Sequence, residues 1–267
     1  MECDADSEPL WLWPNLLSLD APIVAVLWQG FLAYRFSIPL RPAGRLVLFL
    51  TVWAIYLADR LLDARKPPSV PEPARHRYYR RHSNLMTAVL AVVAGSDAAI
   101  AMLWLRPMIL RDGLIPLAGV LLYLAVVHFA GKSIAMPKEI AAALLFTGGT
   151  FVAAWAALPC PQLAWAAVAF FVLCLANMIA IEAWETREPD PALHPLTRWL
   201  ARTYLVWVPA AVIVCVLLGR NAWYESIAVS AAACALLYGI GRRLSLEARR
   251  VLVDGVLLSP MLFLHFR

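Results

Sequence analysis

Two acidic clusters stand at the ends of apolar segments, with Asp59 and Asp63 in one and Glu182 and Glu185 in the other. Residues three or four positions apart share one face of a helix, so each cluster would present paired carboxylates. A carboxylate at the centre of a membrane-spanning helix costs about 2.5 to 3.5 kcal/mol, and less toward the interface. Paired oxygen ligands offset that cost by binding a hard cation. The two clusters therefore predict a site for Mg²⁺ and a diphosphate group.

Basic residues accompany both clusters and suit the remaining phosphate oxygens. Lys132 and Lys138 precede a long apolar segment, and Arg75 and Arg77 follow the first acidic cluster. Guanidinium and ammonium groups form charge-assisted hydrogen bonds with phosphate. For the arginines an alternative stays open, because a basic stretch of this kind also binds anionic lipid and fixes membrane topology.

The elements that carry these residues are apolar and long. The chain has 62% hydrophobic residues, 15% charged residues and a mean hydropathy of +0.70, which indicates a polytopic membrane protein. The apolar runs are continuous and do not alternate, so they predict helices and an all-α fold. About nine runs approach the length that spans a bilayer: 21–39, 43–62, 85–105, 113–130, 139–158, 162–184, 198–219, 222–240 and 246–265.

The remaining segments predict one membrane domain over residues 1–267. Residues 63–84 form the longest polar stretch, which we expect to be a basic loop. Residues 1–20 are acidic and contain Trp11 and Trp13, which indicate an interfacial segment or, equally, a frayed tail. Alternate connections divide the Lys and Arg residues 15 to seven, so the side of the 63–84 loop and of both acidic clusters is predicted to be cytoplasmic.

Two further acids lie deeper in apolar runs, where an ionisable group suggests a function. Asp97 has no basic residue within a turn, so a helix-to-helix hydrogen bond is the expected role. For Asp254 two roles stay open: an ion pair with Arg250, which lies one turn away, or a neutral carboxyl held by a hydrogen bond. The five cysteines are odd in number and form no CxxC pair, so they are read as packing residues.

With these residues in place, the chain resembles the UbiA superfamily of intramembrane prenyltransferases over nearly its whole length. The segment IYLADRLLD is similar to the first acidic motif of the family and keeps Asp59 and Asp63, but not the leading Asn and Asp. Glu182 and Glu185 take the first two acidic places of the second motif, and Asp190 stands beside the third. The segment GKSIAMPKE is similar to the lysine-containing stretch of the family, with Lys132 in a diphosphate-binding place.

The resemblance implies a nine-helix fold and a Mg²⁺-dependent transfer of an isoprenoid chain from a prenyl diphosphate to a lipophilic acceptor such as an aromatic compound. Membrane lipid is the further partner, and a nucleic acid is not expected. Asp59, Asp63, Glu182, Glu185 and Asp190 would be the metal ligands, the first four of them catalytic. Two alternatives remain: a non-catalytic relative that binds lipid or a partner, and an ion-coupled transporter that uses Asp97 and Asp254.

Overall fold

The computed structural model describes residues 9–66, 73–129, 137–185, 193–218 and 221–264, and every regular element within these ranges is a helix. The all-α expectation is therefore met. Five helices are long and apolar enough to cross a membrane: α5 (Ser83–Trp104), α6 (Pro107–Phe129), α7 (Lys138–Ala157), α8 (Pro161–Glu185) and α11 (Ala222–Ile240). Two bent pairs of helices raise the number of candidate spans to seven if each pair is one span. The chain is thus a helical bundle with the composition of an integral membrane protein.

Two of the predicted runs are not single helices. Residues 198–219 are divided between α9 (Pro195–Arg202) and α10 (Tyr204–Leu218), which meet at an angle of 72°. Residues 246–265 form α12 (Leu246–Gly255), a short 3₁₀ turn and α13 (Pro260–Leu264). The second break has a simple cause, because Gly255 favours the end of a helix and Pro260 has no N–H to continue one.

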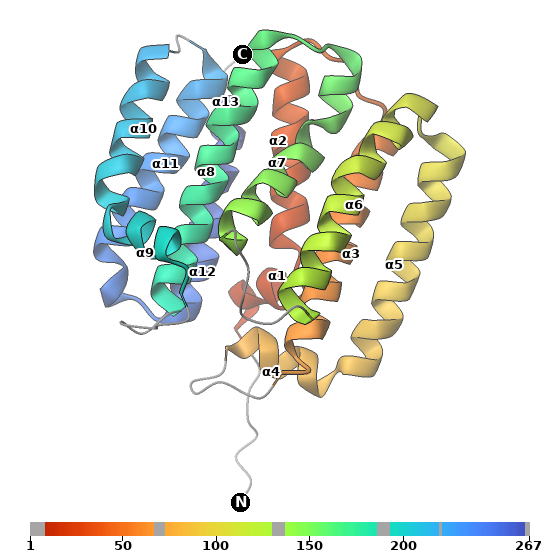
Figure 1. Cartoon of the computed structure of the whole chain (residues 1–267), viewed down its shortest axis with the longest axis horizontal. Helices are drawn as coiled ribbons and strands as arrows, with labels where there is room; N and C mark the ends of the chain where they lie inside the picture. Colours follow the sequence, from red (N-terminus) through yellow and green to blue (C-terminus); the bar gives the residue numbers. More distant parts are fainter. Residues whose placement is uncertain (1–8, 67–72, 130–136, 186–192, 219–220, 265–267) are drawn as a thin grey trace, which may run out of the picture.

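Helices α2 (Asp20–Arg35) and α7 lie side by side in the middle of the bundle (Figure 1). On one flank α3 (Pro42–Asp63) packs against α2 and α5, and α6 packs against α7. On the other flank α8 contacts α7 and α11, and α11 pairs with α10. The acid-bearing ends of α3 and α8 both point to the lower end of the view in Figure 1.

An aromatic cluster joins segments from the N-terminal, central and C-terminal parts of the chain. The indole of Trp28 lies 4.9 Å from the ring of Phe170 and 5.1 Å from that of Trp223, measured between ring centroids. Its Nε1 donates a hydrogen bond of 2.8 Å to the carbonyl of Leu257. All three aromatic side chains are fully buried, so α2, α8, α11 and the C-terminal turn share one core.

The polar stretch 63–84, predicted to be a loop, contains a helix in its later half. This helix is α4 (Ala74–Arg81), and α9 occupies the equivalent position after the second acid-bearing helix; both have eight residues. The hydroxyls of Tyr79 in α4 and Ser18 are 2.9 Å apart. Ser18 lies at the 80° bend before α2 and has a φ of 55°, a conformation that is uncommon for residues other than glycine. This bend therefore contacts α4 through the Ser18 hydroxyl.

The segment before this bend forms a 3₁₀ turn (Leu10–Leu12) and α1 (Trp13–Leu16). Leu12 and Leu16 are buried and pack with Ala74 of α4. Leu10, Trp11 and Trp13 are exposed, an arrangement that fits an amphipathic anchor at the membrane interface.

Topology supplies the first testable prediction. We expect Ser83→Cys, at the start of α5, to face the cytoplasm, and Arg106→Cys, just beyond the other end of α5, to face outward, because basic residues favour the cytoplasmic side. In intact cells, with the native cysteines replaced by serine, an impermeant maleimide should label only the second variant. Labelling of the first variant alone would reverse the topology.

Candidate functional site

The first acidic cluster lies at the end of α3 and is completed by a histidine from α6. The Nε2 atom of His128 is 3.0 Å from Oδ1 of Asp59, and its Nδ1 is 3.9 Å from Oδ1 of Asp63. Lys66 Nζ lies 2.8 Å from the same Asp63 oxygen. The side chain of His128 is only 3% exposed, so it forms the buried side of the cluster.

The second cluster lies at the end of α8 and is held by cations from α7 and α12. Lys138 Nζ is 2.8 Å from Oε2 of Glu182. Two guanidinium nitrogens of Arg250 lie 2.8 and 2.6 Å from Oε1 of Glu185, and Arg250 also contacts Glu247 at 3.4 Å. The Arg250 side chain is 1% exposed and that of Glu185 is 28% exposed, so a buried guanidinium holds a carboxylate that still reaches the surface.

Consecutive residues of α4 connect the two clusters. Arg75 places a guanidinium nitrogen 3.2 Å from Oε1 of Glu185, while His76 Nε2 lies 3.9 Å from Oδ2 of Asp63. Burial and the nearby guanidinium of Arg60 lower the pKa of Arg75 to about 10, and Glu185 opposes that shift, so Arg75 remains charged at neutral pH. Burial and Arg75 lower the pKa of His76, which favours its neutral form. A single eight-residue helix thus spans the space between the clusters.

The ion pairs use the carboxylates unevenly. Arg75 and Arg250 both contact Oε1 of Glu185, and the hydrogen bond from His128 reaches Oδ1 of Asp59. Oδ2 of Asp59 has a looser contact of 3.6 Å with Arg60. The side chains of Asp59, Asp63 and Glu185 are 27%, 23% and 28% exposed, whereas those of Arg250 and His128 are almost fully covered. The accessible part of the site therefore carries these carboxylates together with the half-exposed ammonium groups of Lys66 and Lys138, whereas Arg250 and His128 cover its buried side.

Within the described ranges, no group of three or more His, Cys, Asp or Glu residues gathers that could hold a metal ion by itself. Mg²⁺ seldom uses such a cage, since it usually binds one or two carboxylates together with substrate phosphates and water. The carboxylate oxygens present here, each belonging to a side chain with a basic neighbour within 4 Å, suit that mode of binding. The predicted ligand Asp190 and the predicted phosphate-binding residue Lys132 lie outside the described residues.

Of the other residues singled out from the sequence, Arg75 and Lys138 join the clusters, whereas Arg77 is exposed on α4. Asp97 accepts a hydrogen bond of 2.6 Å from Thr51 of α3, which confirms the helix-to-helix role expected for it. Of the two roles left open for Asp254, the structure shows the hydrogen bond and not the pair with Arg250. Asp254 accepts a hydrogen bond of 3.2 Å from Asn177, because Arg250 is turned toward Glu185 and Glu247.

Sequence reasoning missed two members of the site, His128 and the role of Arg250. A single histidine at the end of an apolar run, in AVVHFA, is indistinguishable by pattern from a core residue. Arg250 is one of four arginines between residues 242 and 250, and nothing in their spacing marks it as the partner of the acidic cluster. Both reach the acidic residues across more than 60 positions of sequence, so only the tertiary fold could reveal them.

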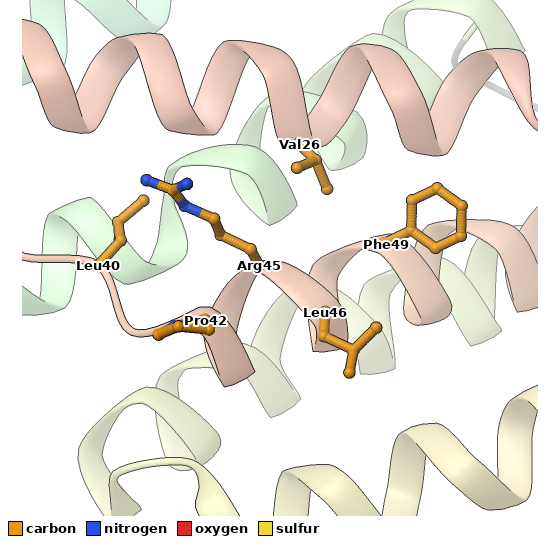
Figure 2. Close-up of a pocket in the computed structure, with 6 residues that line it drawn as sticks. All are labelled: Val26, Leu40, Pro42, Arg45, Leu46 and Phe49. Atoms are coloured by element: carbon orange, nitrogen blue, oxygen red, sulfur yellow. The ribbon is translucent and has the colours of Figure 1, made fainter.

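Two pockets lie away from the acidic clusters. A pocket of about 420 Å³ is lined by residues of α2 and the start of α3, and Figure 2 shows the side chain of Arg45 extending between Leu40 and α2. Along α3, Arg45 and Asp59 are separated by roughly 20 Å, given 1.5 Å per residue. This pocket is therefore near the opposite end of the helix from the site.

A second pocket, of about 280 Å³, is almost wholly apolar and lies between α8, α10 and α11. Ala176 belongs to its lining, and Glu185 follows nine residues later in α8. Nine residues correspond to about two and a half turns, so the two side chains point to opposite faces of the helix. A ligand in this pocket would thus be separated from Glu185 by α8 itself.

Comparison of the chain with protein-family models, with curated proteins and with solved structures finds no match. The inference about function therefore depends on the residues of the site and on their arrangement.

Proposed function

We propose that the protein is a membrane prenyltransferase of the UbiA type, which moves an isoprenoid chain from a prenyl diphosphate to a lipophilic acceptor such as an aromatic compound. The observation that carries the proposal is the link that Arg75 and His76 of α4 make between two carboxylate clusters, about 120 positions apart in sequence, at one end of an all-helical membrane bundle. Charge of both signs is concentrated there, as a bound diphosphate and its counter-ions require.

In this proposal, Asp59, Asp63, Glu182 and Glu185 would hold Mg²⁺ through their carboxylate oxygens. When bound, the ion would neutralise charge on the departing diphosphate. Arg75 and Lys138 are within reach of the same carboxylates and carry positive charge, so they suit phosphate oxygens that the metal does not bind. The bond between the prenyl carbon and the diphosphate oxygen breaks, its electron pair leaves with the diphosphate, and the acceptor loses a proton as the new bond forms.

The second prediction tests this function directly. Purified protein in detergent, incubated with radiolabelled prenyl diphosphates of several lengths, a lipid extract and Mg²⁺, should convert label into a product that organic solvent extracts. We expect Asp59→Asn and Glu185→Gln each to reduce turnover by about 100-fold or more, since each removes charge that stabilises the leaving group. Asp112→Asn and Glu225→Gln make the same chemical changes at the other end of the bundle, and both should retain activity.

One observation favours a second candidate, a non-catalytic relative that binds a lipid or a partner. Each of the four carboxylates has a cationic neighbour within 4 Å, so the network is already compensated without a ligand. Such a protein would show no turnover with any prenyl diphosphate. Its binding of the lipid or partner would also tolerate Asp59→Asn, which separates it from the transferase.

A further inference from the structure

His128 is the residue of the site that comes from α6, and its place is unusual for a histidine in an apolar helix. Its side chain is 3% exposed and lies between the two carboxylates of α3. Nε2 is within hydrogen-bond distance of Asp59, at 3.0 Å, whereas Nδ1 has no hydrogen-bond partner and lies 3.9 Å from Asp63. Since Asp59 is an acceptor, Nε2 must be the nitrogen that donates.

This contact restricts the first acidic cluster in a specific way. Asp59 lies near the end of α3 and its side chain is 27% exposed, so without a partner its carboxylate would sample several rotamers. The hydrogen bond from His128 fixes Oδ1 on the buried side. It leaves Oδ2 as the oxygen with the looser contact, 3.6 Å from Arg60.

We propose that His128 is a positioning residue, which donates a hydrogen bond from Nε2 to orient Asp59 for a divalent cation and its diphosphate ligand. This inference rests on the proposed function and assigns to α6 a part in the site that the acidic motifs do not include. Partners of this kind around ligating carboxylates alter metal affinity by about 10- to 100-fold when they are removed. Removal of His128 should therefore lower the affinity for the cation more than it lowers the stability of the fold.

The third prediction measures that affinity without turnover. Thermal unfolding of the detergent-solubilised protein, followed while Mg²⁺ is titrated in the presence of inorganic diphosphate, should show a rise in the melting temperature of the wild type by mass action. We expect His128→Met to require about 10-fold or more Mg²⁺ for the same rise. His128→Gln should stay within about threefold of the wild type, because its amide nitrogen can occupy the position of Nε2. The melting temperature of each variant without Mg²⁺ reports on the fold separately.

The outcomes separate this inference from the function on which it rests. Equal Mg²⁺ dependence in wild type and His128→Met would overturn the role of His128 and leave the transferase intact. Absence of any response in the wild type would overturn both. If His128→Met does not fold, His128→Asn replaces it, because the shorter amide cannot reach Asp59 as Gln can. Equal Mg²⁺ dependence of the Gln and Asn variants would then refute the proposal.

Discussion

Arg250→Met is expected to lower the free energy of unfolding by about 3 to 5 kcal/mol, the range measured when one partner of a buried ion pair is removed. Arg250 is 1% exposed, and it binds Glu185 through two nitrogens and Glu247 through a third contact. Methionine fills a similar volume but leaves Glu247 without this buried partner and Glu185 with Arg75 alone. Unfolding by SDS titration in mixed micelles, monitored by tryptophan fluorescence, would measure the loss.

The control for this fourth prediction is Arg81→Met, which removes an exposed arginine from α4 and should change stability by no more than about 0.5 kcal/mol. A double-mutant cycle then isolates the pair. Arg250→Met should cost less in a Glu185→Gln background, because the neutral amide no longer needs a cation. Equal costs in the two backgrounds would show that the pair with Glu185 adds nothing to the packing of Arg250 and its contact with Glu247.

Elements whose signal is local could be predicted well from the sequence. The ends of α3, α5, α7, α8 and α11 fall within a few residues of the ends of the predicted runs. Helix α6 starts at Pro107, six residues before its predicted run 113–130. Continuous hydrophobicity over about 20 residues permits little besides a helix in a membrane. Breaks inside a run, as at Thr203 and Pro260, were not predicted, because an apolar composition is compatible with both a straight helix and a bent one.

The same distinction between local and tertiary signals applies to the site. The pairing of carboxylates on one face of α3 follows from their spacing, and a single site for the two clusters was predicted; in the structure α4 links them through Arg75 and His76. Lys138 was expected at the site, as a phosphate ligand. His128 and the role of Arg250 were not predicted, because these residues come from two other helices. Their identity depends on how those helices pack, which the local pattern of residues does not encode. The arrangement of the site thus depends on contacts between segments whose own sequences do not mark them as members of it.

The largest purely structural effect is expected for Trp28→Ala, at about 3 to 5 kcal/mol, the usual cost of removing a large buried aromatic side chain. Trp28 is fully buried, contacts Phe170 and Trp223, and donates a hydrogen bond to the carbonyl of Leu257. Alanine would leave a cavity and an unpaired carbonyl in the same place.

The measurement for this fifth prediction is again SDS titration, with Trp104→Ala on α5 as the matched control. Trp104 is 59% exposed and faces the surroundings of the bundle, so its loss should cost less than about 1 kcal/mol. The acidic clusters lie at the ends of α3 and α8, and α2 and α8 meet at Trp28. Loosening this contact should therefore also weaken the Mg²⁺ response of the site, although Trp28 touches none of its residues. Unchanged stability in Trp28→Ala would mean that the bundle can close around the missing side chain, and that this aromatic cluster does not set the position of α8.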